Sequence, residues 1–459
     1  MAIFGPLSVG RHALLTHQRA LQVTGHNIAN VNTPGFSRQR VQLEPIPPNG
    51  DRTGTGVRVA GVDRIVDPFI EARQLANGSA FGDAVAARDL LQQLEANFPV
   101  TGGGIGDALQ EFFATTNALA ADPASLAARG ELVSAAENLA ARIREGAGAI
   151  SSFQREADAR FVQGVSDTNA LLEKVASLNR EIVAARIAGT SDNDLQDIRQ
   201  EALRDLSQQL QLNVVEQADG AVNVFARTGT ALVLGASATN LQTEPSAATA
   251  LDGGSLSRLG VVGDSGAFIP IGTGFGGALG ALETLRDTTF VQTASALDAL
   301  ADGLRLEVNA VQAAGFDLDG LPGGDLFAGT GAADLTVALA DSRGIAAAQS
   351  ANPADNTNAL DLVAVQDNRT IAGLGGQTLG EYFGSFHAGI GQQTRSASDQ
   401  AIIEEQVAGT LAAQRDSVSG VSLEEEFTDL IRFQRAFQAA AQLISVSNSM
   451  LDDLIGLVR

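Results

Sequence analysis

The strongest sign of cofactor chemistry in the sequence is a glycine-rich segment, Gly272–Gly277, which fits the dinucleotide-binding pattern G-x-G-x-x-G. It follows a strand-like run at 267–269, and Asp298 lies at a plausible distance for the acid that binds the ribose. That fingerprint needs a βαβ unit whose second strand carries the acid. Asp298 instead lies in a run that continues as helix, so the glycines predict a flexible return from strand to helix and no nicotinamide site.

A second acidic and glycine-containing segment, Asp317-Leu318-Asp319-Gly320, hints at a calcium loop. An EF-hand would place a ligand at Leu321, a glycine at Pro322 and a glutamate at Ala328. Because all three are missing, the segment predicts an ordinary turn.

The remaining residues with catalytic potential lack the spacing that chemistry requires. The four histidines show no metal-binding spacing, and His12 and His17 are five residues apart on one expected helix, so their side chains diverge. A phosphate-binding loop needs a lysine after glycine, but Lys174 follows Glu173 inside an expected helix. We therefore expect no enzyme activity, no cofactor and no metal.

Composition limits the partners of the chain. A net charge of −23, with Lys174 as the only lysine, repels phosphate backbones and anionic lipid, so neither nucleic acid nor a membrane is an expected partner. Cysteine is absent, which excludes a disulfide framework. No run of about 18 apolar residues is present, and the N-terminus lacks a standard secretory signal. Composition alone would indicate a cytoplasmic protein of two to four domains.

Apolar residues recur every seven positions at both ends of the chain, which is typical of helices that face a partner helix. Ser422 and Glu425 form a capping-box pattern at the start of the C-terminal helix, and Thr33-Pro34-Gly35 predicts a type II turn that ends the N-terminal one. Two arrangements remain open, an antiparallel pair within one chain and a polymerisation seam between chains. The predicted interface comprises Leu7, Leu14, Leu21, Ile28, Leu423, Phe427, Leu430, Phe437, Ile444, Leu451, Ile455 and Val458.

A long helical body lies between these ends. Apolar residues continue in steps of three or four from Leu126 to Ile182, with Asp122 as the expected N-cap and Pro123 at the first helical position. A second helical block is expected at 277–314. Short strand-like runs at 222–226 and 231–234, separated by Asp-Gly and Thr-Gly pairs, predict a small β domain between 213 and 271. Residues 315–380 look like loops, with a short strand at 335–339.

The segment from Val23 to Arg38 resembles the N-terminal signature of the bacterial flagellar rod, hook and hook-associated axial proteins. The residues that carry the resemblance are Asn27, Ile28, Asn30, Asn32, Thr33, Pro34, Gly35 and Phe36. Three further stretches are similar to the hook-associated protein 1 family: Gly54–Val62 with Asp67–Ile70, Asn309–Gly320 with Asp325–Phe327, and Gly420–Glu426 with Ile431–Ala439. The short span from Phe327 to Gly380 departs from that family, whose additional outer domain looks reduced or absent here.

The resemblance implies a mainly α fold, a discontinuous multi-domain rod with coiled-coil-like paired N- and C-terminal helices, a helical bundle body and a small outer β domain. The domain ranges would be 1–64 plus 415–459 for the inner terminal-helix domain, 65–212 plus 272–414 for the helical body, and 213–271 for the inserted β domain.

The same resemblance implies a structural junction adaptor that joins hook to filament. Its partners would be further copies of itself in a ring, the hook protein, the second hook-filament junction protein, and a cytoplasmic export chaperone at the C-terminal helix. It would be secreted through the type III export apparatus to the extracellular flagellum. The alternatives are another flagellar axial protein (hook, rod or second junction protein) and, more remotely, a secreted effector or an NAD-binding enzyme.

Overall fold

The computed structural model describes residues 4–47, 54–99, 102–263, 266–350 and 352–457. The chain is mainly α-helical, with long helices at both ends and small β-sheets between them, so the predicted fold class is confirmed. None of the described helices has an apolar stretch long enough to cross a membrane. Contacts group the chain into two compact units, one formed by residues 1–79, 168–240 and 405–459, the other by 80–167 and 241–404.

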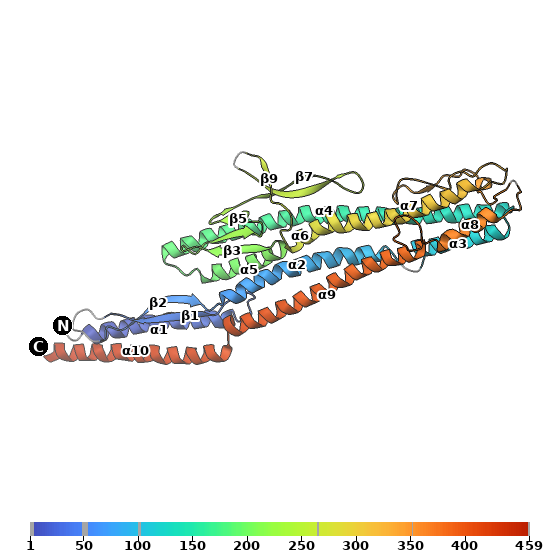
Figure 1. The fold of residues 1–459 in the computed structure, drawn as a ribbon. Coiled ribbons are helices and arrows are strands. Elements are labelled where there is room, and N and C mark those ends of the chain that lie inside the picture. Colours follow the sequence, from blue (N-terminus) through green and yellow to red (C-terminus); the bar gives the residue numbers. More distant parts are fainter. Residues whose placement is uncertain (1–3, 48–53, 100–101, 264–265, 351, 458–459) are drawn as a thin grey trace. The chain divides into compact units, whose positions relative to one another are not determined.

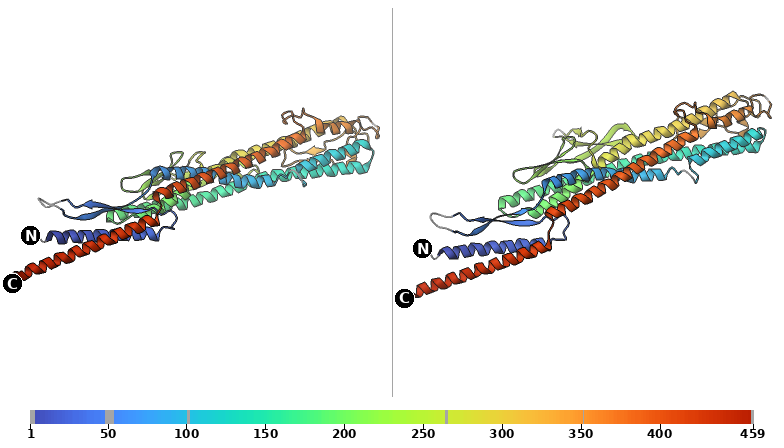
Figure 2. Two further views of the ribbon diagram at one scale, coloured as in Figure 1. Left: turned by 90° about the horizontal axis from the view of Figure 1, so that it is seen from below. Right: turned by 60° about the horizontal axis from the view of Figure 1, so that its bottom comes forward.

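The first unit contains the terminal helices, α1 (Phe4–Ala29) and α10 (Leu423–Leu457). They lie side by side, with the start of α1 and the end of α10 at the same end of the pair (Figures 1 and 2). Contacts along the pair agree, because Gly10 lies against Ile444 whereas Asn27 bonds Glu426. The two helices are therefore antiparallel.

The Pro-Gly turn predicted after α1 is present. Gly35 has a φ of +79°, and the amide of Phe36 donates to the carbonyl of Thr33 at 3.2 Å, so Pro34 and Gly35 occupy the central positions of a type II turn. Gly35 tolerates this positive φ because it lacks a Cβ. The chain then enters an antiparallel hairpin, β1 (Gln39–Pro45) and β2 (Val57–Arg64), which packs on α1.

The rest of the first unit is built around α5 (Asn193–Gln209) and a four-stranded antiparallel sheet in the order β3-β4-β5-β6. The strands are β3 (Leu212–Glu216), β4 (Val222–Ala226), β5 (Ala231–Leu234) and β6 (Ser237–Ala238). Buried Arg199 joins helix to sheet, since its guanidinium donates to Asn179 Oδ1 at 3.0 Å and to the carbonyl of Gly220 at 2.7 Å. Three helices contribute residues to both units: α2 (Pro68–Ala96), α4 (Leu126–Ala188) and α9 (Leu379–Ser419).

The second unit adds helices and two smaller sheets. The predicted helical block at 277–314 is confirmed, as α6 (Gly277–Thr284) and α7 (Phe290–Ala314) joined by a π-helical turn at Leu285–Thr289. The other elements are α3 (Ile105–Ala121), α8 (Thr357–Ala364), a sheet of β7 (Leu241–Thr249), β8 (Ser255–Val262) and β9 (Phe268–Pro270), and a pair of β10 (Phe327–Ala328) and β11 (Thr336–Val337). Helix α8 lies within the span that was expected to be loops.

The start of α4 differs from the prediction. Asp122 ends α3 as its C-cap, and Ser125 caps α4 instead, accepting from the amide of Ala128 through its hydroxyl at 3.3 Å. Pro123 therefore lies before the helix, where its carbonyl accepts a bond from Arg129 Nε at 2.8 Å. Asp122 and Ser125 are both residues that can cap a helix. Because Asp122 ends α3, Ser125 is the residue that caps α4.

The two segments with apparent chemistry are turns in the structure. The glycine-rich segment leads from β9 into α6 and buries Phe275, whose ring centroid lies 6.1 Å from that of Phe161. Asp298 lies within α7 and accepts from the amide of Ala332 at 2.7 Å. Asp317 accepts from the amides of Asp319 and Leu321, as in an ordinary turn.

The strands between 212 and 270 form two separate sheets, and these fall in different compact units. The predicted strands at 222–226 and 231–234 are present as β4 and β5. The division into an inner terminal-helix domain, a helical body and one inserted β domain stays a prediction.

Candidate assembly interface and the clamp at its base

The terminal helices lie close together at Gly10. A Cβ at this position would lie 2.8 Å from Ile444 Cγ1, so glycine allows the two backbones to come together. Farther along the pair, the rings of His17 and Phe433 lie 6.2 Å apart, and Ala20 and Val23 are buried. Burial lowers the pKa of His17, which favours its neutral form in this apolar contact.

The predicted heptad residues divide between two environments. Half-buried side chains in the described part of the pair are Leu7, Leu14, Leu21, Ile28, Leu430, Phe437, Ile444 and Leu451. Leu423 and Phe427 are instead 42% and 51% exposed. The side chains of Ile455 and Val458 lie outside the described residues. The antiparallel pair within one chain is thus formed, whereas contact of these rows with a second copy stays a prediction.

The sequence reasoning missed an outer apolar surface on both helices. Ile431, Val446 and Met450 of α10 are at least half exposed, and so is Leu15 of α1. The three residues of α10 lie outside the heptad rows, and Val446 and Met450 are four residues apart. The spacing of Leu423, Phe427 and Ile431 at intervals of four could have indicated this second face.

A polar clamp joins the end of α1 to the start of α10. Asn27 Nδ2 donates to the carbonyl of Gln39 at 2.8 Å and to Glu426 Oε2 at 3.1 Å. Its Oδ1 accepts from the amide of Gln39 at 3.0 Å. Both Asn27 and Glu426 are only 2% exposed. One buried amide therefore fixes the helix end, the first strand and α10 together.

Arg38 supplies the charge that balances Glu426. Its Nε donates to Glu426 Oε1 at 2.7 Å, a second guanidinium nitrogen bonds Glu425, and its amide donates to the carbonyl of Ser419 at 2.8 Å. Burial by itself lowers the pKa of Arg38, but the hydrogen bonds and charges of Glu425 and Glu426 outweigh burial and raise it. The predicted capping box is not formed in the described residues, because Glu425 pairs with Arg38 instead of reaching back to the amide of Ser422.

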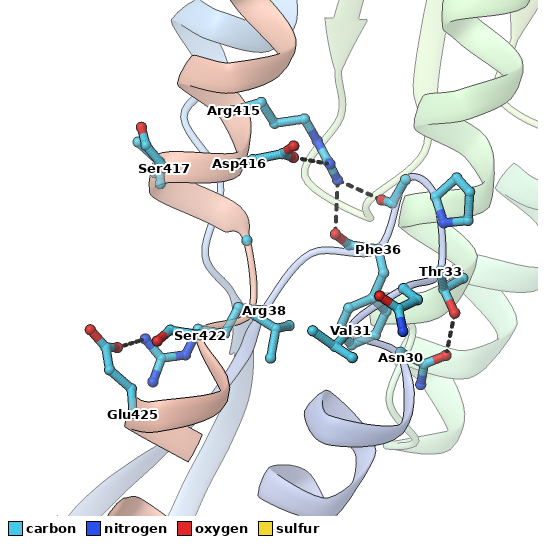
Figure 3. Close-up of a pocket in the computed structure, with 16 residues that line it drawn as sticks. Asn30, Val31, Thr33, Phe36, Arg38, Arg415, Asp416, Ser417, Ser422 and Glu425 are labelled. Carbon is cyan, nitrogen blue, oxygen red and sulfur yellow. Dashed lines mark hydrogen bonds and ion pairs between the residues drawn. The ribbon is translucent and has the colours of Figure 1, made fainter. Parts of the chain in front are cut away.

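The same loop is held from α9. Arg415 Nη2 donates to the carbonyls of Gly35 and Phe36 at 2.6 and 3.0 Å (Figure 3). The amide of Ser37 donates to Asp197 Oδ2 of α5 at 2.9 Å, and Asp197 also pairs with Arg64 at 2.8 Å. These bonds tie the loop to both α9 and α5.

Charge near this attachment is partly buried. Burial raises the pKa of Glu71, although the positive charges of Arg64, Arg204 and Arg415 oppose that shift. Burial also lowers the pKa of Arg415, and neighbouring Arg204 adds to this effect. The positive charges of the arginines therefore offset part of the cost of burying the Glu71 carboxylate.

The family-motif residues are mainly structural in this arrangement. Thr33 donates to Asn30 Oδ1 at 3.1 Å, and Asn30 donates to the carbonyl of His26 at 3.0 Å. The ring of Phe36 packs edge-on against His26 at 5.4 Å. Asn32 and Pro34 are exposed. A polar groove of about 570 Å³ lies between this loop and the α9–α10 connection. Figure 3 shows residues that line it.

Replacing Arg38 with alanine should loosen the start of α10. The change leaves the Glu426 carboxylate, whose side chain is 3% exposed, without its cation. Removing one partner of a buried ion pair typically costs about 3 kcal/mol or more. Hydrogen exchange of the amides at 423–430 should accelerate on the order of a hundredfold, as expected for local opening of that size.

The matched control is Arg40→Ala, since Arg40 lies two residues further on and is exposed. Equal protection of 423–430 in the two variants would show that the Arg38–Glu426 pair does not hold the joint.

Comparison with known proteins places these features in a family. A family model described as the flagellar hook-associated protein FlgK helical domain matches residues 91–327, more than half of the 459-residue chain. The chain belongs to the flagellar hook-associated protein FlgK family. Two further models match its ends, the flagella basal body rod protein at 7–36 and the C-terminal model of the flagellar basal body rod FlgEFG proteins at 412–457. These end matches cover α1 with its motif loop and α10 with the end of α9.

Curated relatives match over nearly the whole chain. Flagellar hook-associated protein 1 of Bacillus subtilis (strain 168) is 27% identical over 98% of this chain and 98% of its own length. The protein of the same name from Escherichia coli (strain K12) is 24% identical over 96% and 97%. The structure of the flagellar hook junction protein FlgK from Burkholderia pseudomallei matches 76% of this chain and all of that one with a TM-score of 0.68, and at 17% identity it shows the shared fold. Within the FlgK family, the chain has a structural role in the bacterial flagellum.

Proposed function

We propose that this chain is the adaptor between hook and filament, and that it assembles into a ring of copies through its terminal helices. The observation that carries the proposal is the α1/α10 pair, whose two helices match flagellar rod families at the two ends of the chain. Residues 436–451 of α10 contain no charged side chain, in a chain with a net charge of −23. A surface without charges can be covered by another protein at little desolvation cost.

The clamp gives this assembly surface a fixed base. The bonds of Arg38 and Arg415 attach the pair to α9, and the bond from the amide of Ser37 to Asp197 attaches it to α5. A load on the terminal helices would therefore pass into α5 and α9. This is a mechanical role, and we propose that the chain has no enzymatic one. The Gly272–Gly277 segment serves as a return into α6, with Phe275 anchored in the core.

The proposed route and partners follow from family membership. The chain would leave the cell through the flagellar type III apparatus after a cytoplasmic chaperone has held its C-terminal helix. Outside, it would contact the hook protein on one side and the second junction protein on the other. The relatives named hook-associated protein 1 and hook junction protein support the junction over a place within the hook or rod.

Immunogold electron microscopy tests this placement directly. An antibody raised against the purified chain should label intact flagella only at the boundary between hook and filament, and the chain should be present in sheared extracellular flagella. Labelling along the hook or within the rod would instead identify another axial protein. A chain that stays in the cytoplasm would contradict the flagellar assignment itself.

A further inference from the structure

The outer face of α1 carries two arginines around an exposed leucine. Arg11, Leu15 and Arg19 are four residues apart and therefore share one face of the helix. Leu15 is 52% exposed, and both arginines are exposed as well. Among the described residues neither arginine pairs with an acid, and Arg19 only donates to Gln22 at 3.4 Å. Helix α1 contains no acidic residue, so this face is a basic-flanked apolar patch.

The start of α10 carries an exposed apolar stripe that is flanked by acidic residues. Leu423, Phe427 and Ile431 follow the same four-residue steps and are 42%, 51% and 50% exposed. Glu424 lies beside this stripe, is exposed, and has no cationic partner in the part of the chain that the structure describes. Helix α10 contains six acidic residues against two arginines. An exposed aromatic at the centre of such a stripe is typical of an interaction surface.

These two faces cannot meet within one chain. Antiparallel pairing places Phe427 beside the end of α1, next to Asn27 and Glu426. Leu15 lies 12 residues earlier on α1, which corresponds to roughly 18 Å along the helix axis. Both faces also point away from the half-buried rows between the helices. A contact between these two faces is therefore possible only between different molecules.

We infer that the Arg11–Leu15–Arg19 face of one copy packs on the Leu423–Phe427–Ile431 stripe of a second copy, with Glu424 placed among the arginines. The inference rests on the proposed function and names the surfaces through which copies join. Such a contact joins different surfaces of identical chains, so its repetition produces a ring or a helical array. Equal spacing of the two rows lets the apolar side chains interleave while the charges pair.

The far end of α10 is the competing surface. Leu443, Val446 and Met450 are also exposed there. No charged residue lies between Leu443 and Met450, and the acids nearest to this stripe, Asp452 and Asp453, lie beyond its end. Glu424 instead lies within the length of the stripe at the start of the helix. Charge complementarity therefore selects the stripe at the start of the helix.

Disulfide crosslinking can test the contact, because the chain has no native cysteine that could form other disulfides. Leu15→Cys and Phe427→Cys are made in separate copies of the full chain, which are co-produced in the deletion strain. Mild oxidation of isolated flagella should give a linked dimer only when both variants are present, since a disulfide needs Cα atoms within about 7 Å. The matched control is Val446→Cys, whose native side chain is 51% exposed, as is that of Phe427. Ile431→Cys provides a second position on the stripe.

Exchanging charges between the two copies tests whether Glu424 faces the arginines of α1, which crosslinking alone does not show. Adding Glu424→Arg to the Phe427→Cys copy should lower the dimer yield about fivefold, because like charges then meet at a rim contact. Adding Arg19→Glu to the Leu15→Cys copy should restore the yield.

Each result bears on a distinct claim. Linkage of Leu15→Cys to Val446→Cys in place of Phe427→Cys and Ile431→Cys overturns the proposed surface. So does the absence of dimer in flagella that contain both variants. A chain that is absent from the hook-filament boundary contradicts the proposed function first, and immunogold labelling of the same preparations reveals that case.

Discussion

A strain that lacks this chain is expected to build hooks that end without filaments and to release filament subunits into the medium. The proposed adaptor supplies the surface on which the next axial protein assembles. Without that surface, exported subunits have no template and diffuse away. Electron microscopy of the cells and immunoblotting of the medium measure both results, and swimming motility should be lost completely.

Reintroduction of the unchanged chain should restore filaments, which controls for effects on neighbouring genes. Hooks with filaments of normal length on the deletion strain would refute the junction role. Cells without hooks or without rods would instead indicate that the chain acts earlier along the axis. Each phenotype thus corresponds to one of the axial positions considered.

Replacing both Phe437 and Ile444 with aspartate is expected to open the terminal helix pair and abolish assembly. Both side chains are half-buried, and Ile444 lies against Gly10 of α1. Loss of apolar burial together with burial of two carboxylates should destabilise the pair by on the order of 3–6 kcal/mol. The two arginines of α1, Arg11 and Arg19, are exposed, so they do not offset the new carboxylates inside the pair.

Limited proteolysis with mass spectrometry and circular dichroism of the purified chain measure the opening. Residues 4–29 and 423–457 should become readily cleaved, while the helices outside the pair stay resistant, because those helices have a core of their own. Hook-tip localisation of tagged variants measures assembly.

The control for this prediction is Gln438→Asp with Gln442→Asp, two exposed positions on the same helix. These substitutions place the same charge on α10 without entering the contact with α1, so the pair should stay closed. If the Phe437/Ile444 variant resists protease as well as the control does, that row does not hold the two helices together. If both variants assemble equally well, the row is also not needed for polymerisation.

Local sequence signals determined much of the fold. The seven-residue spacing predicted a long helix at each end, and Pro34-Gly35 predicted the turn after the first one because only glycine adopts the required φ readily. The strands at 222–226 and 231–234 followed from short apolar runs between glycine turns. The absence of charge between 436 and 451 is likewise a property of the sequence itself. These features depend on neighbours a few residues away.

Contacts between distant residues decided the site. Arg38 and Glu426 meet across 388 positions of the chain, and the pairing of Arg38 with Glu425 removed the capping box that the local pattern suggested. Ser125 rather than Asp122 caps α4, because α3 uses Asp122 at its own end.

The largest such difference concerns the apolar rows of the terminal helices. Periodicity showed that α10 has an apolar face, but it could not show which face α1 covers and which stays exposed. A helix repeats its side-chain directions regardless of its neighbours, whereas burial depends on the helix packed beside it. Only the tertiary structure, by pairing α1 with the Phe437–Ile444 row, left Phe427 and Ile431 uncovered within the chain.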